Sequence, residues 1–344
     1  MKSGGKMKNK NQILGINNIF SSIDTKNSNL SRYSIWKRNK ATLWYYPSPE
    51  KKYITPIFLI YSLVNRPDIL DLHPGLSVIE SFILNGFDVY LIDFGTPGYE
   101  DKDITLDDYI EKYIQKGVQR ALLHSNAKEI TVIGYCLGGT LAAIYTAIAK
   151  EPVKNLILYV TPLDFSTVPS FDTWAKALRE DAVNFDEIIT VFGILPPAFV
   201  KVGMRLLTSP VYITPYLSLI SRANDEAYVR KWLSFNRWMK SYLPLVGATV
   251  RNLMNDLVKD NKLVKGKLLI NGKKANLKNI TCNLLVISSE EDRLVSKEQT
   301  YSIIELASSK DKTYALSKNG HAGFSVKKGH LPEYIDQWLP QDLK

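Results

Sequence analysis

The sequence predicts an α/β protein with a mostly parallel central sheet, helices on both faces and an inserted helical cap. Short apolar runs alternate with helical segments in the first half of the chain and again near its end. Because parallel strands need crossover connections, this alternation favours a parallel sheet. From residue 166 to residue 261 the pattern changes to aromatic-rich, proline-interrupted helical segments, which we interpret as the cap.

The first strands and helix are expected before residue 94. Residues 41–46 are rich in aromatic residues and are expected to form an edge strand, and 56–61 form a continuous apolar run typical of a buried strand. A helix is expected over 75–85 and a strand over 88–93, followed by the glycine and proline turn 95–98.

The next segments continue the alternation. Apolar residues recur at helical spacing over 107–126, and acidic Asp107 and Asp108 stand where a helix N-terminus favours negative charge. The apolar runs 129–134 and 155–160 are expected strands. Between them, the small residues of 137–150 indicate a helix packed closely on the sheet.

After the cap, the core is expected to resume with two strands and two helices. Strands are expected at 283–288 and 312–316, with helices at 297–307 and 331–339. The predicted organisation is a basic polar leader, the first part of the core, the cap and the second part of the core, over residues 1–40, 41–165, 166–261 and 262–344.

Composition excludes several classes of protein. Hydrophobic residues make up 45% of the 344 residues and charged residues 23%, which is typical of globular proteins. Most of the net charge of +10 lies in residues 1–40, which contain nine Lys and Arg residues and one acidic residue, Asp24. Such a leader is either a solvated tail or a binder of acidic partners or anionic surfaces, and no pattern for nucleic-acid recognition accompanies it.

Neither a secretory signal nor a transmembrane run is found, so a cytoplasmic protein is expected. The two cysteines, Cys136 and Cys282, lie far apart and do not suggest a disulfide framework.

Cys136 is the candidate nucleophile. It lies in Gly134-x-Cys136-x-Gly138, between an apolar strand and a small-residue helix, which is the context of the nucleophile elbow of α/β-hydrolase folds. The positive end of the helix dipole favours a thiolate there. A buried, inert thiol is the alternative for Cys136, and it is the interpretation we prefer for Cys282, which has no glycine context.

His321 is the expected base among four histidines. It lies in a loop after the last expected strand, where this fold presents its histidine. His124 and His330 are expected on the surface, and His73 stays an unsupported alternative.

The acid should lie on a loop between nucleophile and histidine in the chain. Asp292 is preferred over Glu290 and Glu291 because it closes the turn before an apolar pair, and Asp164 is the rival. For the oxyanion hole we expect the backbone N–H groups of Leu137 and Val64.

The chain resembles the polyhydroxyalkanoate synthases, in particular the short forms that work with a second subunit, over about residues 42–339. The segments that carry this resemblance are Tyr61-Ser62-Leu63-Val64-Asn65-Arg66-Pro67 with Leu70-Asp71-Leu72, residues 86–93, Asp107-Asp108-Tyr109-Ile110 and Gly134-Tyr135-Cys136-Leu137-Gly138-Gly139-Thr140. Three further segments follow in the family's order, namely Thr161-Pro162-Leu163-Asp164-Phe165, Asp292-Arg293-Leu294-Val295 and Gly320-His321-Ala322-Gly323. Three positions depart from the family pattern, namely Phe94, Asn319 and Ala322.

The resemblance implies an acyltransferase that polymerises (R)-3-hydroxyacyl-CoA into polyester and releases CoA. Cys136 would attack the thioester with His321 as base, and Asp292 would help His321 to activate the 3-hydroxyl group. It implies no cofactor, since the CoA thioester is the substrate, and no metal is expected. The implied partners are the growing polyester and a second small synthase subunit at the granule surface, with a homodimer as a further option.

Two other functions stay open at this point. One is a polyester depolymerase or esterase-type hydrolase on the same fold, against which the cysteine argues, since hydrolases of this fold mostly use serine. The other is a non-catalytic granule subunit attached through its basic leader.

Overall fold

The computed structural model describes most of the chain. The described residues are 30–166, 172–182, 185–208, 219, 222, 224–318, 320–321, 329–332 and 334–339.

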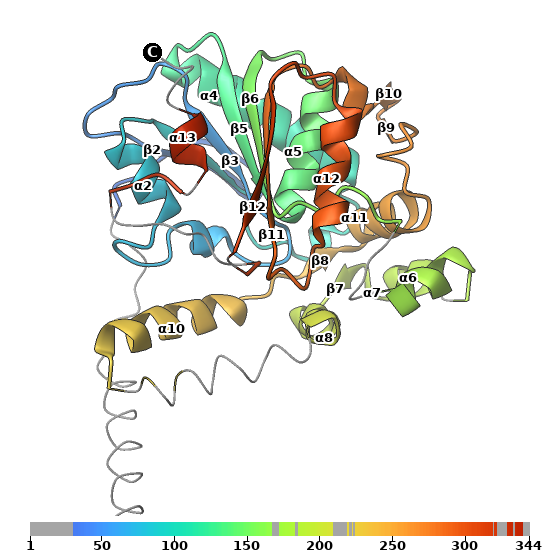
Figure 1. Cartoon of the computed structure of the whole chain (residues 1–344). Coiled ribbons are helices and arrows are strands. Elements are labelled where there is room, and N and C mark those ends of the chain that lie inside the picture. Colours follow the sequence, from blue (N-terminus) through green and yellow to red (C-terminus); the bar gives the residue numbers. More distant parts are fainter. Residues whose placement is uncertain are drawn as a thin grey trace, which may run out of the picture.

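An eight-stranded sheet forms the centre of the molecule (Figure 1). Its order is β1-β2-β4-β3-β5-β6-β11-β12, and β2 alone runs against the other strands. The strands are β1 (Tyr33–Arg38), β2 (Ala41–Tyr46), β3 (Ile57–Ile60), β4 (Val89–Asp93), β5 (Ile130–Tyr135), β6 (Val153–Tyr159), β11 (Asn283–Ser289) and β12 (Lys312–Ser317). The predicted mostly parallel sheet is confirmed.

The edge of the sheet corrects one expectation. Ala41–Tyr46 is the second strand and not the edge strand, because β1 pairs outside it within the expected leader. The aromatic residues Tyr33 and Trp36 favour a strand, and the turn at Asn39, whose φ is 49°, closes a tight hairpin to β2. The strand β1 was not predicted, because the net positive charge of residues 1–40 indicated a polar leader over the whole segment.

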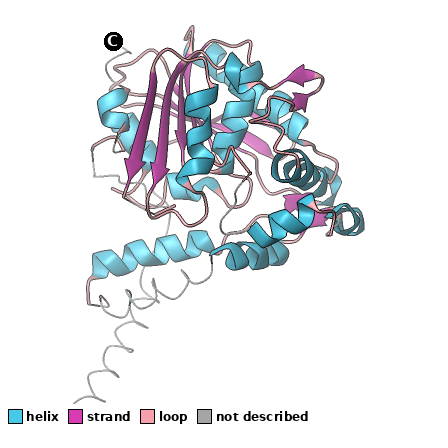
Figure 2. Ribbon diagram, turned by 45° about the vertical axis from the view of Figure 1, so that its right-hand side comes forward, coloured by secondary structure: helices cyan, strands magenta, loops and turns pink. Residues whose placement is uncertain are grey.

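Helices cover both faces of the sheet (Figure 2). Successive residues of the central strands point alternately into two buried hydrophobic cores, one on each face. One core is covered by α3 (Leu106–Asp108), the π-helical η3 (Tyr109–Gln115), α4 (Lys116–Ser125), α5 (Leu137–Ile148) and α12 (Lys297–Leu306). The other is covered by α2 (Val78–Leu84) and α13 (Ile335–Trp338).

Cap helices lie beyond the ends of the central strands, at the bottom of Figure 1. They are α6 (Asp172–Arg179), α7 (Phe185–Phe192), α8 (Pro197–Thr208) and α10 (Glu226–Met239), with the short strands β7 (Ile194–Leu195) and β8 (Leu245–Val246) joining the cap to the core. The last helices of the expected cap segment, α11 (Gly247–Asn252) and η4 (Leu253–Lys259), pack on the core, since Leu253 and Leu257 belong to the first core.

Short elements complete the described structure. They are η1 (Pro67–Leu70), η2 (Tyr99–Asp101), the hairpin of β9 (Leu269–Ile270) and β10 (Lys273–Lys274), and η5 (Leu277–Asn279). Within the described ranges, no helix has the length and apolar character needed to cross a membrane.

Candidate active site

Cys136 occupies a sharp turn between β5 and α5. Its φ of 52° and ψ of −129° lie in a region that L-residues rarely adopt. Three backbone hydrogen bonds hold this conformation: the Cys136 N–H donates to the Tyr159 carbonyl at 3.0 Å, and the Cys136 carbonyl accepts from the N–H groups of Gly139 and Thr140 at 2.8 and 3.4 Å. The strain is therefore maintained by both neighbouring elements, and the thiol is presented at the carboxyl edge of the sheet.

The glycines around Cys136 are a steric requirement of this turn. A side chain at Gly134 would place its Cβ 2.4 Å from the Cα of Gly139, and one at Gly138 would place it 2.3 Å from the carbonyl oxygen of Ile60. Both contacts are with backbone that cannot move away cheaply. The turn can therefore lie against α5 and the end of β3 only without those side chains.

His321 and Asp292 form a hydrogen-bonded pair. The His321 Nδ1 lies 2.7 Å from Oδ2 of Asp292, whose side chain is 0% exposed. The other carboxylate oxygen accepts the N–H groups of Leu294 and Val295 at 2.8 and 2.9 Å. Because two backbone donors fix the carboxylate, it holds the imidazole in one orientation and leaves Nε2 for another partner.

The imidazole of His321 is coupled to the Cys136 sulfur. Burial lowers the pKa of His321, but the charge of Cys136, the hydrogen bonds to Asp292 and Cys136, and the charge of Asp292 raise it to about 10. This shift favours the imidazolium form of His321. The structure thus brings together the three side chains that the sequence singled out.

The rival acids lie elsewhere or face solvent. Asp164 accepts hydrogen bonds from the Asn261 side chain and the Ser166 N–H, both at 2.8 Å. Although burial raises the pKa of Asp164, these bonds lower it below its ordinary value. Asp164 therefore stabilises a turn, while Glu290 and Glu291 are exposed side chains.

The remaining histidines have no described contact with Cys136. The ring of His124 bonds the Tyr90 hydroxyl at 2.8 Å, and His73 Nδ1 lies 2.8 Å from the Pro74 carbonyl. His330 is exposed. Asn319 and Ala322, which flank His321 in the sequence, lie outside the described residues.

Cys282 stands in contrast to Cys136. Burial raises the pKa of the Cys282 thiol to about 11, so this sulfur stays protonated near neutral pH.

The two residues expected to form the oxyanion hole differ in their surroundings. Leu137 opens α5, directly after the nucleophile. The Val64 N–H donates to the Ser62 hydroxyl at 3.2 Å, and the Val64 carbonyl accepts from Leu243 N–H at 2.9 Å. Val64 is thus tied to the segment that follows α10, and its N–H would have to exchange the Ser62 oxygen for an oxyanion.

Tyr135 is a residue of the site that sequence reasoning missed. Its hydroxyl donates to the backbone carbonyl of His321, and its ring packs edge-on against the imidazole, with centroids 5.7 Å apart. The rings of Tyr61 and Tyr159 stack on either side of it at 5.4 and 5.6 Å. A tyrosine at or just beyond the ends of three neighbouring strands was the signal in the sequence.

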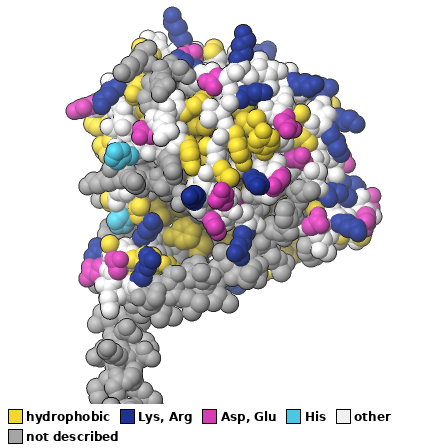
Figure 3. Space-filling view, in the orientation of Figure 1, with side chains coloured by type: hydrophobic (Ala, Val, Ile, Leu, Met, Phe, Trp, Pro, Cys, Tyr) yellow, Lys and Arg dark blue, Asp and Glu magenta, His cyan; other side chains and the backbone are white. Residues whose placement is uncertain are grey.

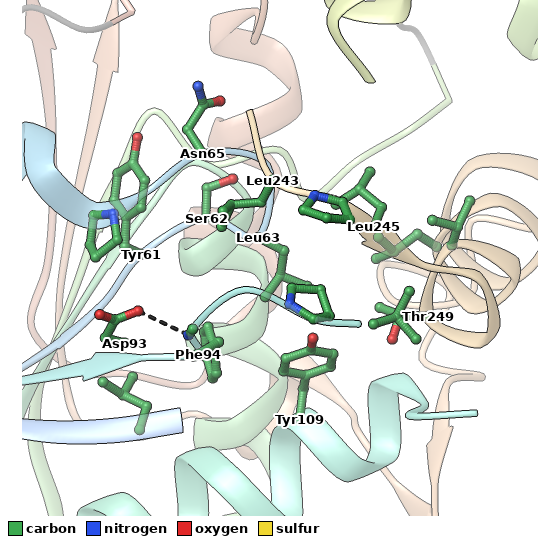
Figure 4. Close-up of a pocket in the computed structure, with 18 residues that line it drawn as sticks. Tyr61, Ser62, Leu63, Asn65, Asp93, Phe94, Tyr109, Leu243, Leu245 and Thr249 are labelled. Carbon is green, nitrogen blue, oxygen red and sulfur yellow. Dashed lines mark hydrogen bonds between the residues drawn. The ribbon is translucent and has the colours of Figure 1, made fainter. Parts of the chain in front are cut away.

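A small apolar cavity lies beside the segment that carries Val64 (Figure 4). Its volume is about 20 Å³, enough for about one water molecule. Leu63, Phe94 and Tyr109 come from the core, and Leu243 and Leu245 from the return of the cap (Figure 4). The segment that returns from the cap therefore packs directly on the loop that carries Val64.

Comparison with known proteins gives three results. A family model described as alpha/beta hydrolase fold matches residues 66–328. The chain is 33% identical to the poly(3-hydroxyalkanoate) polymerase subunit PhaC of Haloferax mediterranei over 89% of this chain. It is 30% identical to the same subunit of Synechocystis over 90% of this chain and 84% of that protein.

The chain covers a smaller share of the Haloferax and Haloarcula proteins than of the Synechocystis protein. The chain spans 63% of the length of the Haloferax protein and 65% of that of Haloarcula marismortui. Among solved structures, a monoglyceride lipase variant from Saccharomyces cerevisiae is similar with a TM-score of 0.55 and 13% identity, over 86% of this chain and 88% of that one. This likeness concerns the fold alone, and it agrees with the predicted α/β-hydrolase architecture.

Proposed function

Because the chain belongs to the family of poly(3-hydroxyalkanoate) polymerase PhaC subunits on the α/β-hydrolase fold, we propose that it polymerises (R)-3-hydroxyacyl-CoA into polyester with release of CoA. The observation that carries this proposal is the grouping of Cys136, His321 and Asp292 at one edge of the sheet. A thiolate nucleophile suits a thioester substrate, because the acyl-enzyme it forms is again a reactive thioester.

In the first half-reaction, the Cys136 thiolate attacks the thioester carbonyl of the substrate. A tetrahedral oxyanion forms, and the N–H groups of Leu137 and Val64 are our candidates to stabilise it. The carbon–sulfur bond to CoA then breaks, and the His321 imidazolium gives its proton to the departing thiolate. Free CoA leaves, with the acyl group on Cys136 and a neutral imidazole.

In the second half-reaction, a 3-hydroxyl group attacks the acyl carbon on Cys136. His321 takes the hydroxyl proton, and Asp292 stabilises the imidazolium that results. The bond between the acyl carbon and the cysteine sulfur breaks, an ester forms, and the thiolate–imidazolium pair returns. Each cycle lengthens the polyester by one unit.

CoA release from (R)-3-hydroxybutyryl-CoA tests this proposal. The purified chain, alone or with a small partner subunit, should release CoA and form polymer, and Cys136→Ala should abolish both. Free hydroxy acid as the sole product would instead identify a hydrolase. No release of CoA in either mixture would favour a non-catalytic granule subunit.

Two further parts of the proposal concern partners and place. We include a second small subunit and the surface of polyester granules, because both accompany the short synthases that this sequence resembles. Stimulation of CoA release by such a subunit, and co-sedimentation of the active chain with the polymer it makes, are the expected results.

A further inference from the structure

A second cavity, of about 220 Å³, lies between η1 and α10. Its charged lining residues are Arg66, Asp68 and Arg237, and Trp238 also lines it. Arg66 precedes η1 in the core, whereas Arg237 lies in the last turn of α10. At the junction of the core with α10, hydrophobic side chains gather with Lys and Arg side chains beside them (Figure 3). Core and cap thus each supply one guanidinium to the same cavity.

A short series of contacts connects this cavity with the nucleophile. The Trp238 indole N–H donates to the Arg66 carbonyl at 3.0 Å, and the segment that carries Arg66 begins at Tyr61. The Tyr61 ring stacks on that of Tyr135, the residue before Cys136, with centroids 5.4 Å apart, and the Tyr61 backbone lies against Gly138 of the same turn. The segment from Tyr61 to Arg66 therefore runs from the turn that carries Cys136 to the cavity.

We propose that this cavity binds the diphosphate of the CoA thioester, with Arg66 and Arg237 as its counter-charges. The inference rests on the proposed function and locates the non-reacting end of its substrate. The pantetheine arm separates the thioester from the phosphates, so the phosphates must bind beside the nucleophile and not on it. Guanidinium groups recognise phosphate oxygens through paired hydrogen bonds, which makes two converging arginines suitable for a diphosphate.

Asp68, the acidic residue of the cavity, allows a second test of the proposal. Burial raises the pKa of Asp68, while Arg66 and Arg237 oppose this shift. Its carboxylate lines the same cavity as the two guanidinium groups, so it would repel the phosphates of CoA. Replacement of Asp68 by an uncharged isostere should therefore strengthen binding, opposite to replacement of either arginine.

A larger basic groove, of about 520 Å³, is the other candidate for the phosphates. Its charged lining residues are Lys37, Arg38, Lys116 and Arg120. It lies along β1, and β2, β4 and β3 separate that strand from β5, which leads to Cys136. The cavity beside Trp238 is thus the one that the contacts connect to the sulfur.

The experiment compares two thioesters of (R)-3-hydroxybutyrate, one of CoA and one of pantetheine, which lacks the diphosphate. Arg66→Gln and Arg237→Gln should each raise the ratio of the CoA to the pantetheine KM by about tenfold, the effect of one lost charged hydrogen bond. Asp68→Asn should lower this ratio. Arg230→Gln, on the same helix but paired with Glu226 at 3.3 Å, is the matched control and should leave the ratio unchanged.

An unchanged ratio in both arginine variants would overturn the inference, and so would a rise in Asp68→Asn. Failure of the proposed function is recognised separately, as no turnover of either thioester by the unmodified chain. In that case, titration of CoA into the Cys136→Ala protein, with and without Arg66→Gln, decides the inference. Tenfold weaker binding with Arg66→Gln supports it, and equal binding or none contradicts it.

Discussion

At the scale of single residues, the site depends on how His321 is held. Asp292 bonds Nδ1 of the imidazole, and the Tyr135 hydroxyl donates to the backbone carbonyl of the same residue. Asp292 is itself bound by two backbone N–H groups. His321 is therefore held by its side chain and its backbone at once, which is the preorganisation that its proposed role in proton transfer needs.

The first residue-scale prediction concerns pH. The folded-state pKa of His321, about 10, lies above the ordinary value of about 6.5, so its stabilising contribution is complete below about pH 6.5 and is lost as pH rises through about 10. The free energy of unfolding of the wild type should therefore exceed that of His321→Gln most at about pH 6.5 and below, and the difference should shrink as the pH rises towards 10. Denaturant titrations between about pH 7 and pH 10.5 measure this difference, and a constant difference would contradict the assignment.

The second residue-scale prediction concerns Tyr135→Phe, which keeps the ring stack but removes the hydroxyl. We expect kcat to fall about tenfold, since a buried hydrogen bond is lost, and the alkaline limit of activity to move to lower pH as His321 loosens from its partners. A purely structural loss would lower the melting temperature without moving the pH profile. An unchanged kcat and profile would show that Tyr135 does not position the base.

Much of the site could be predicted at this scale, because its residues follow a known order along the chain. The order nucleophile, acid, histidine, each after an apolar strand, singled out Cys136, Asp292 and His321. The contact of Tyr135 with His321 was not predicted, because it joins a side-chain hydroxyl to a backbone carbonyl, and the order of the motifs along the chain does not encode such a contact. Nor could the sequence show that Val64 N–H already has an internal acceptor in Ser62.

At the scale of elements, the elbow requires close approach of β5, α5 and the end of β3. Gly138→Ala would bring a Cβ within 2.3 Å of the Ile60 carbonyl oxygen, which belongs to the backbone of a central strand. We expect a loss of about 2 kcal/mol in the free energy of unfolding, measured by denaturant titration. Gly203→Ala, in α8, is the control: nothing lies within 4 Å of its Cβ, so it should not destabilise the fold. Equal effects would contradict the steric account.

The elements also show where sequence patterns are sufficient. The continuous apolar runs predicted the buried parallel strands correctly, because a strand that is covered on both faces consists mainly of apolar residues. The edge strand β1 was missed because its exposed residues, such as Lys37 and Arg38, look like part of a charged leader. About half of the side chains of an edge strand can be polar or charged. The net charge counted over residues 1–40 therefore does not reveal such a strand.

At the scale of the whole molecule, the cap and the core share the candidate binding surfaces. The segment after α10 packs on the loop of Val64, and α10 supplies Arg237 and Trp238 to the cavity beside η1. The sequence indicated a cap from its change in pattern, but it could not show which cap residues contact the core. Those contacts depend on the packing of segments that are far apart in the chain.

The central claim is that Cys136 carries the acyl group during synthesis, and trapping of the acyl-enzyme tests it most directly. The chain is mixed with (R)-3-hydroxybutyryl-CoA, quenched in acid, digested and analysed by mass spectrometry. We predict hydroxybutyryl groups on the peptide that contains Cys136 and none in the Cys136→Ala protein. Polymer formation by Cys136→Ala, or acylation of another residue in its place, would contradict the account.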